Sequence, residues 1–461
     1  MPLWICDWEL CRYPAVQRDG DCLLCRKHLC RTHLREPWHA CPRAEENWEA
    51  YSLQYAAAEA HDLDQLRRKI NVSKLCSRAS MIRNGIPCVV DLSTKQLASM
   101  MGNQNCHAEI AFEDGVVWIA RFRITKATSP PQEVRDFIIR SEAATMSYLC
   151  QNTRLPVPRI YDWSDESNPE NNIGVSYILM EKLDGRPLDW RAATPTQREK
   201  IMQQVADIYI EIERHPFGSM GSLVTSSRNP HHLEVQGLAQ HTTYQSETGH
   251  ALGPFSSPVD GSAAIIETYL TMIASGELIA SRPIDAYLTH RFRLDVIDRL
   301  WTGSTAEKRF FLKHPDDKGD HILVNDDFDI VGIIDWEWTR TVSSMEAFCS
   351  PSMMWPISKF YAGSNELAQD ELRLAEVFRE KGREDLSEHI LTGRKVQRFF
   401  FAMGPESPSD VSNFTSLFAG LAGAFDYEHE EWERWKNEAL NRWKDDNQLR
   451  NLVQQDGEKE G

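Results

Sequence analysis

The chain has 461 residues, of which 41% are hydrophobic and 26% charged, and its formal net charge is −17. This length and composition predict a soluble globular protein with about two or three domains and a large buried core. The acidic excess argues against general binding to nucleic acid or anionic membranes, because both need a basic face. No apolar run reaches the roughly 18–20 residues of a membrane-spanning helix, and the N-terminus lacks the charged and apolar regions of a signal peptide.

The cysteines fall into two sets. Six of the 11 lie within the first 41 residues and have the spacing of metal ligands rather than that of a secreted disulfide framework. We expect the other five to be reduced. Reduced thiols indicate an intracellular location, which we take to be the cytoplasm, with the nucleus left open. The scattered set comprises Cys76, Cys88, Cys106, Cys150 and Cys349.

The first 41 residues contain four close pairs of metal-ligand residues, spaced C-x4-C, C-x2-C, C-x2-H and H-x-C. Two ligands on one turn chelate a metal with little loss of loop entropy, and four pairs suffice for two closed tetrahedral Zn²⁺ sites. Because so short a segment cannot bury enough surface to fold alone, the metal would supply its folding energy. The alternative is a tail rich in free thiols. The candidate zinc ligands are Cys6, Cys11, Cys22, Cys25, Cys30, His33, His39 and Cys41.

The full spacing, C-x4-C-x10-C-x2-C-x4-C-x2-H-x5-H-x-C, resembles the AN1-type zinc finger over residues 6–41. The resemblance implies structural zinc ions and a finger that recruits a protein partner. Nucleic-acid binding by the finger is disfavoured by its mixed charge and its lack of a basic helix. The family cross-braces its pairs, which implies one zinc on Cys6, Cys11, Cys30 and His33, and the other on Cys22, Cys25, His39 and Cys41.

A hairpin is predicted further along the chain. The apolar runs 322–324 and 330–334 have the length of short strands, and Asp326 and Asp327 supply turn chemistry between them. Acidic residues precede the first run and follow the second, so the hairpin brings carboxylates to one end of the structure. Phosphoryl transfer needs one Asp to orient the attacking hydroxyl and another to hold Mg²⁺. The alternative is an ordinary acidic hairpin with solvated carboxylates.

The segment HPDDKGDHILV before this hairpin matches the kinase pattern H-R-D-L-K-P-E-N-I-L-L without a gap. It resembles the catalytic loop of protein-kinase-like enzymes, specifically the aminoglycoside phosphotransferase (APH) type. The resemblance implies that Asp316 is the catalytic base and Lys318 the loop lysine. It implies Mg²⁺ ligands at Asp335, the D-F-G aspartate, and at His321, where the pattern has Asn. Magnesium prefers oxygen to imidazole nitrogen, so the adjacent Asp320 is a third candidate ligand.

The likeness extends to the preceding residues. The alternating segment 116–124 resembles the kinase strand that carries the phosphate-pairing lysine, but Arg121 takes its place. Arginine is also a cation that binds phosphate. The helical segment 132–151 contains Glu142, which resembles the glutamate that pairs with that cation; a surface glutamate is the alternative. The segment from Glu181 to Leu183 resembles the hinge that binds adenine through its backbone.

This resemblance implies an α+β, protein-kinase-like bilobal fold of the APH type, with a turn at 217–223 similar to that of fungal members. The predicted parts are the finger at 1–43, a helical linker at 44–91, an N-lobe at about 92–183, a C-lobe at about 184–445, and a polar tail at 446–461. An Ala-, Glu- and Leu-rich composition without Pro or Gly supports helices over residues 44–72.

The function that the resemblance implies is transfer of the ATP γ-phosphate to a small-molecule hydroxyl, with Mg²⁺ as cofactor. The alternative is a pseudokinase-like adaptor whose kinase fold is a scaffold and whose finger recruits a protein. Arg121, His321 and a segment with a single glycine at 101–107 favour the adaptor. The retained Asp316 and Asp335 favour nucleotide-linked activity.

Overall fold

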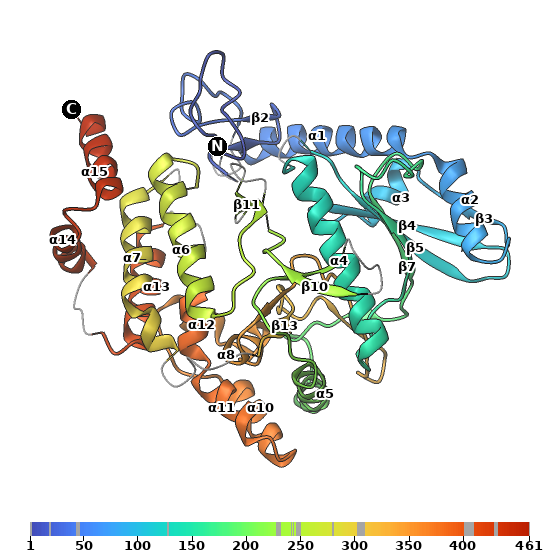
Figure 1. Ribbon diagram of the computed structural model, residues 1–461. Coiled ribbons are helices and arrows are strands. Elements are labelled where there is room, and N and C mark those ends of the chain that lie inside the picture. Colours follow the sequence, from blue (N-terminus) through green and yellow to red (C-terminus); the bar gives the residue numbers. More distant parts are fainter. Residues whose placement is uncertain are drawn as a thin grey trace.

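A computed structural model of the chain shows a finger, a sheet-rich lobe and a helical lobe (Figure 1). It describes residues 2–17, 20–42, 47–126, 129–226, 232–240, 242, 244–245, 250–278, 281–301, 309–400, 410–427 and 432–460. The first residues of the predicted linker, 44–46, lie outside this described part.

The N-lobe is built on a five-stranded antiparallel sheet in which the strand order is β3-β4-β5-β7-β6. Burial alternates along β4, as expected for a strand with one face on a core. The tight turn between β4 and β5 contains Gly115, which has a left-handed φ of 85°. The strands are β3 (Cys88–Val90), β4 (Asn105–Phe112), β5 (Val117–Arg123), β6 (Ile160–Ser164) and β7 (Tyr177–Glu181).

Helices cover both faces of this sheet. On one face α1 (Trp48–Lys69), α2 (Val72–Ile82) and α3 (Thr94–Ser99) share a core with the strands, so the predicted linker packs as part of the N-lobe. Each buried leucine in such a core contributes about 1.5–3 kcal/mol. On the other face lies α4 (Gln132–Asn152), the helix predicted to contain the paired glutamate.

The predicted hairpin forms. Strand β14 (Ile322–Val324) pairs antiparallel with β15 (Ile330–Ile333), and β8 (Arg186–Pro187) adds a third strand at its edge. Beside it, β13 (Phe311–Lys313) pairs with β16 (Arg340–Val342), so the chain enters and leaves the hairpin region through adjacent strands.

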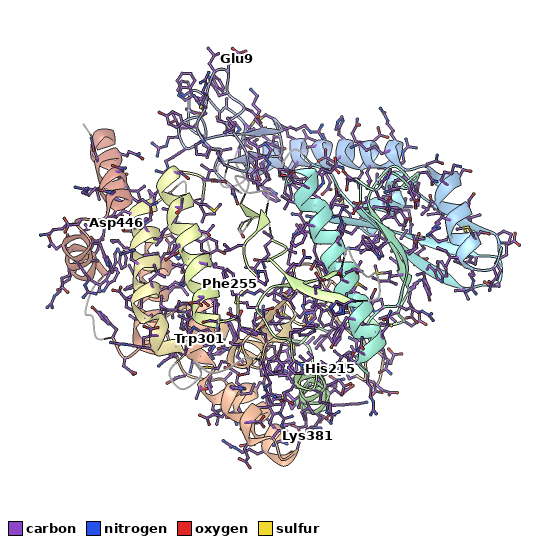
Figure 2. The ribbon with its side chains drawn as sticks, viewed as in Figure 1. Glu9, His215, Phe255, Trp301, Lys381 and Asp446 are labelled. Carbon is purple, nitrogen blue, oxygen red and sulfur yellow. The ribbon has the colours of Figure 1, made fainter. Side chains whose placement is uncertain are left out.

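The C-lobe is helical, and its core includes the fully buried Trp301 (Figure 2). Its longer helices are α5 (Pro195–Glu213), α6 (Pro258–Ser275), α7 (Pro283–Leu300), α10 (Gln369–Glu380), α11 (Glu384–Thr392), α12 (Arg394–Phe400), α13 (Val411–Ala424), α14 (Trp432–Arg442) and α15 (Asn447–Glu460). Its short elements are α8 (Ser344–Ala347), η2 (Ser352–Met354) and α9 (Ile357–Tyr361), with strands β9 (Ser222–Thr225), β10 (Leu233–Gln236), β11 (Tyr244–Gln245) and β12 (His250–Ala251).

The observed architecture confirms the predicted α+β class, with a sheet-rich lobe followed by a helical C-terminal region. The C-terminal end differs from expectation. Residues 447–460, predicted as a polar tail, form α15, and Leu449 and Leu452 are buried in the C-lobe core. Two leucines spaced one helical turn apart suffice to dock an otherwise polar helix. Among the described residues, no helix combines the length and apolar character needed to cross a membrane.

The finger is docked onto the body rather than tethered loosely to it (Figure 1). At the end of α6, the Glu277 carboxylate accepts hydrogen bonds from Leu3 N at 3.0 Å and Gln17 Nε2 at 3.1 Å. The Glu277 carbonyl accepts from Gln17 N at 2.6 Å. On the other side, Arg26 forms an ion pair with Asp62 of α1. The finger therefore contacts both lobes.

We predict that Glu277→Ala weakens this docking by about 2–3 kcal/mol, because it leaves a buried glutamine side chain without its charged partner. The unfolding temperature measured by calorimetry should fall while zinc content stays unchanged, since no ligand is touched. Glu267→Ala, an exposed glutamate of α6 itself, is the control. Equal melting of the two variants would contradict the docking role.

Candidate functional site

Two Cys/His groups lie in the finger, and within each group the potential ligand atoms are all within 4.8 Å of one another. They are the same two groups that the AN1 resemblance implies. The two-stranded β1–β2 hairpin (Asp21–Cys22 and Lys27–His28) supports one group. Trp8, stacked on His33 at 5.2 Å, shields the other. The groups are Cys6, Cys11, Cys30 and His33, and Cys22, Cys25, His39 and Cys41.

The donor set fits zinc. Three thiols and one imidazole per group give the closed tetrahedral set typical of structural zinc. Burial raises the pKa of Cys6 to about 11, and burial together with the neighbouring Cys22 and Cys25 raises that of Cys41 to about 12. These thiols therefore remain protonated at neutral pH until a cation displaces the protons, so zinc binding must release protons and weaken in acid.

The centre of the kinase-like site is Arg121 on β5. Its guanidinium forms an ion pair with Glu142 of α4, and a second with Glu337 at 2.7 Å. Its Nη2 also lies 3.3 Å from an Oδ1 of Asp335. Arg121, Glu142 and Glu337 are 6%, 4% and 3% exposed. The structure thus brings together the predicted Arg121, Glu142 and Asp335, and joins α4 and β5 to the segment after the hairpin.

Glu337 is a central residue to which the sequence reasoning assigned no role. It also pairs with Arg123, and it accepts a hydrogen bond from Asn105 Nδ2 at 2.7 Å. Burial acts to raise the pKa of Glu337, but the charges of Arg123 and Arg121 hold it below its ordinary value. The sequence did contain a signal for a further carboxylate such as Glu337. Arg121 and Arg123 alternate on one strand face, and two buried cations require more than one carboxylate.

The carboxylates around Arg121 differ in burial. Burial raises the pKa of Glu142 to about 7, against the opposing effect of Arg121, and Glu337 and Asp335 add to the rise. Asp335 is different in position, since its side chain is 61% exposed. Its backbone φ of 63° is left-handed, a conformation that costs a non-glycine residue about 1–3 kcal/mol. The chain therefore holds this exposed carboxylate in place through a strained turn.

The residues of the predicted catalytic loop form a second cluster. Lys318 Nζ lies 3.0 Å from Asp316 Oδ2 and 3.8 Å from Asp320 Oδ2. The loop is fixed to the end of β15 through the His314 ring, whose Nδ1 is 2.6 Å from the Asp316 carbonyl oxygen. The Nε2 of the same ring is 2.9 Å from the Ile334 carbonyl oxygen. The loop is thereby held next to Asp335.

The His321 ring is held by stacking on a neighbouring ring. Its ring stacks on His314 with centroids 4.1 Å apart, and its buried Nδ1 has no hydrogen-bond partner among the described residues. Burial lowers its pKa to about 2, so the imidazole is neutral. Within the described residues, groups of three or more converging ligand atoms occur only in the finger, so Asp335, His321 and Asp320 form no such group.

The predicted hinge lies between β7 and β8. Glu181 ends β7, and its carboxylate accepts from Arg159 N at 3.2 Å. The backbone N–H and C=O of Leu183 make no hydrogen bond within the described part of the chain. Gly185 approaches the β14–β15 hairpin closely, since an added Cβ would lie 2.7 Å from Val331 Cγ2. The hinge thus packs on the hairpin and leaves Leu183 available to a ligand.

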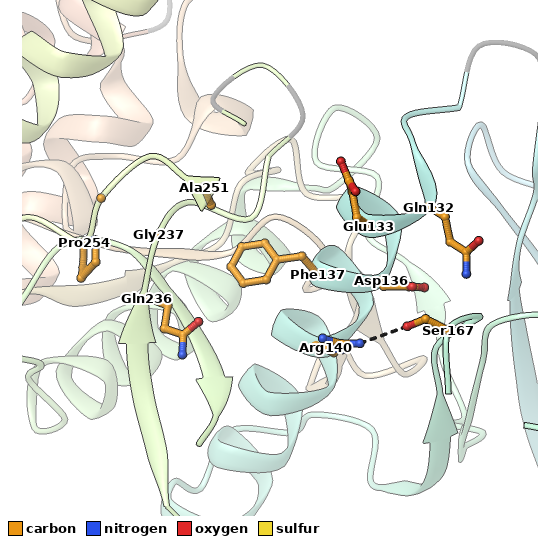
Figure 3. A pocket seen from close by; sticks show the side chains of 11 residues that line it. Gln132, Glu133, Asp136, Phe137, Arg140, Ser167, Gln236, Gly237, Ala251 and Pro254 are labelled. Carbon is orange, nitrogen blue, oxygen red and sulfur yellow. Dashed lines mark hydrogen bonds between the residues drawn. The ribbon is translucent and has the colours of Figure 1, made fainter. Parts of the chain in front are cut away.

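A large cavity of about 710 Å³ lies elsewhere, between the start of α4 and the residues Gln236, Gly237, Ala251, Gly253 and Pro254 (Figure 3). Phe137 points into it, and Arg140 donates to Ser167 Oγ at 3.2 Å on its wall. None of the predicted site residues lines this cavity.

The chain was compared with known proteins. No family model matches it. Two curated proteins, subtelomeric hrmA-associated cluster proteins from two strains of Aspergillus fumigatus, are each 34% identical to it over 102 residues. The match covers 22% of this chain and 20% of each relative, so the chain spans about a fifth of the length of the curated relatives it matches.

Similar solved structures are small-molecule kinases. A Thermobifida fusca protein assigned as a fructosamine-3-kinase has 17% identity and a TM-score of 0.45, over 77% of this chain and 100% of that one. A Plasmodium vivax ethanolamine kinase has 11% identity and a TM-score of 0.39, over 86% and 89%. An aminoglycoside 2′-phosphotransferase solved with GDP has 15% identity and a TM-score of 0.37, over 75% and 89%. At these scores the likenesses carry no argument about substrate or catalysis.

For the finger, we predict two zinc ions per chain by native mass spectrometry, and one in Cys41→Ser. Cys150→Ser, an exposed cysteine outside both groups, is the control and should keep two. Because burial raises the pKa values of the Cys6, Cys25 and Cys41 thiols, protons compete with zinc for them, and zinc should be lost as the pH falls. Two ions retained by Cys41→Ser would contradict the assignment.

For the buried network, we predict that Glu337→Gln destabilises the protein by about 3–5 kcal/mol, because it leaves two buried arginines short of a charge. The pKa of Glu337 is lower folded than unfolded, where it is about 4.3. Its contribution is therefore present above about pH 4 and is lost as the pH falls through the folded value. Denaturant unfolding should show a difference between wild type and variant that is constant near neutrality and shrinks in acid.

The matched control for that experiment is Glu170→Gln, an exposed N-lobe glutamate. It should change the free energy of unfolding by less than about 0.5 kcal/mol. A Glu337→Gln effect as small as this would mean that the buried network contributes no stability.

Proposed function

We propose that the chain is a Mg²⁺- and ATP-dependent phosphotransferase of the APH-like class that acts on a small-molecule hydroxyl. The observation that carries the proposal is the buried Arg121–Glu142 ion pair, joined to Asp335 at 3.3 Å. In kinases, the equivalent cation–glutamate pair and the metal-binding aspartate must both be in place for phosphoryl transfer. Arg121 and Asp335 are 214 positions apart in the sequence. Their proximity in the folded chain supports the proposal.

The residues have distinct proposed roles. Asp316 orients the acceptor hydroxyl and takes its proton, and Lys318 Nζ lies 3.0 Å from that carboxylate. Asp335 and Asp320 offer the oxygens that suit Mg²⁺. Bound Mg²⁺-ATP would supply the phosphoryl group and neutralise its developing charge. The backbone of Glu181 and Leu183 would bind the adenine.

His321 has a different proposed role from the one that the resemblance implies. A neutral imidazole stacked on His314 stiffens the catalytic loop, because the His314 ring accepts a hydrogen bond from Asp316 N at 3.2 Å and lies 2.9 Å from the Ile334 carbonyl oxygen. This packing supports a positioning role, and Mg²⁺ would then depend on carboxylates and water.

One observation favours the second candidate, a pseudokinase-like adaptor. Arg121, the cation that would meet the nucleotide phosphates, already contacts three carboxylates: Glu142, Glu337 and Asp335. A cation neutralised in this way attracts phosphate weakly. The phosphotransferase proposal therefore requires Mg²⁺ to draw Asp335 away from Arg121, whereas the adaptor needs no nucleotide. Recruitment of a protein partner by the finger belongs to this second candidate.

The test is thermal stability with ATP alone and with Mg²⁺-ATP. We predict stabilisation by Mg²⁺-ATP, little by ATP alone, and none in Asp335→Ala, because ligand that binds only the folded state raises its stability. Asp316→Asn should keep the Mg²⁺-ATP shift and lose phosphate transfer by about a hundredfold or more.

Asp326→Ala, an exposed aspartate in the turn of the same hairpin, is the control and should respond as wild type does. If Mg²⁺-ATP stabilises neither wild type nor control, the phosphotransferase proposal is wrong and the adaptor stands.

A further inference from the structure

Leu3 connects the finger to the surroundings of the candidate site. Its side chain packs against a buried group formed by Val134 and Ile138 of α4 and by Ala239. Trp338 packs against the same group. We call these five residues the Leu3 cluster. Because Trp338 lies in the segment that follows the β14–β15 hairpin, the cluster joins that segment to the finger and to α4.

The backbone of the finger holds Leu3 in this position. The Trp4 carbonyl oxygen accepts a hydrogen bond from Ala15 N at 3.0 Å, and Cys6 N donates to the Tyr13 carbonyl oxygen at 2.9 Å. These bonds pair the segment that begins at Leu3 with residues 13–15, and the first Cys/His group lies at the loop between the paired segments. Metal bound to that group would therefore fix the segment from which the Leu3 side chain extends.

The C-lobe anchors the same segment at the end of α6. The Glu277 carboxylate accepts hydrogen bonds from Leu3 N at 3.0 Å and from Gln17 Nε2 at 3.1 Å. Glu277 and Gln17 are buried, and a hydrogen bond that is shielded from water is electrostatically stronger than an exposed one. The backbone of Leu3 is thus bound to the C-lobe, whereas its side chain packs on a helix of the N-lobe.

The turn that follows the hairpin needs support from its surroundings. Asp335 and Trp338 both have a φ of 63°, which lies in the left-handed region. This conformation is unfavourable for a residue with a bulky side chain unless neighbouring structure holds it in place. The hydrogen bond from Thr339 N to the Trp336 carbonyl oxygen is long, at 3.3 Å. The packing of Trp338 in the Leu3 cluster therefore contributes to holding the turn.

The Leu3 cluster also adjoins the buried ion pairs. Ile138 precedes Glu142 by one helical turn, so the two side chains lie on the same face of α4. Both residues line a small cavity of about 10 Å³ together with Arg121. A displacement of the cluster would therefore reach the ion pairs from two sides, through α4 and through Trp338, which directly follows Glu337.

We propose that Leu3 is a positioning residue through which the metal-bound finger holds the 335–338 turn, and with it Asp335 and Glu337, against Arg121. Loss of the Leu3 side chain or of the metal releases the turn. The geometry of the candidate site thus depends on the folding of the finger. For its effect on phosphate transfer this inference rests on the proposed phosphotransferase function, but the coupling itself can be measured without nucleotide.

The test is hydrogen–deuterium exchange, read by mass spectrometry, on the full-length protein saturated with zinc. In Leu3→Ala, amides of residues 335–340 and 136–142 should exchange at least about tenfold faster than in wild type, because lost packing makes local opening easier. Amides of α10 and α11, which lie outside the Leu3 cluster, should be unchanged. Leu3→Met, which nearly conserves the side-chain volume, should restore the exchange of wild type.

Leu10→Ala removes a fully exposed leucine of the same finger and is the matched control, which should exchange as wild type does. Removal of zinc with EDTA should speed exchange over residues 335–340 as Leu3→Ala does. The inference is overturned if Leu3→Ala or zinc removal leaves exchange over this segment unchanged, or if Leu10→Ala accelerates it equally.

Thermal stabilisation by Mg²⁺-ATP, measured on the same samples, separates this inference from the proposed function. A normal shift in wild type together with unchanged exchange in Leu3→Ala contradicts only the positioning role of Leu3. Faster exchange in Leu3→Ala without any Mg²⁺-ATP shift in wild type contradicts only the phosphotransferase.

Discussion

Two buried arginines on one strand set the condition that the rest of the candidate site must satisfy. Arg121 and Arg123 lie on the face of β5 that is turned toward α4, away from the core shared with α1, α2 and α3. Buried guanidinium groups are costly unless carboxylates surround them. The carboxylates come from a helix and from the segment after the hairpin. The ion pairs that neutralise the two arginines therefore also fix the N-lobe against the C-lobe. Stability and the geometry of the candidate site thus depend on the same contacts.

The sequence was most informative where function depends on residues close together in the chain. The hairpin at 322–333, the helix containing Glu142 and the close ligand pairs of the finger follow from local spacing, and the structure contains each of them. The division of those pairs into two Cys/His groups is what the AN1 resemblance implies. Ligand pairs within a turn and strands joined by a tight turn are encoded by neighbouring residues, which a pattern can detect.

Features that depend on distant residues were not predictable in this way. Glu337 follows Asp335 by two positions, but its importance depends on Arg123, 214 positions earlier. The docking of α15 depends on a core formed by α6 and α7. Likewise, the linker pattern predicted helices without indicating that they cover the N-lobe sheet. In each case the missing information was which surface the local element would contact.

The contacts of the finger have a consequence for biosynthesis. Gln17 and Glu277 are 260 positions apart, and at roughly 5–20 residues per second a ribosome needs about 13–50 s to make the intervening chain. During that interval the finger lacks its partner beside α6, whereas Asp62 of α1, which pairs with Arg26, is made early. A segment of this size would need metal to fold alone, so the zinc that we predict for its two Cys/His groups would have to be supplied before the interface with α6 can close.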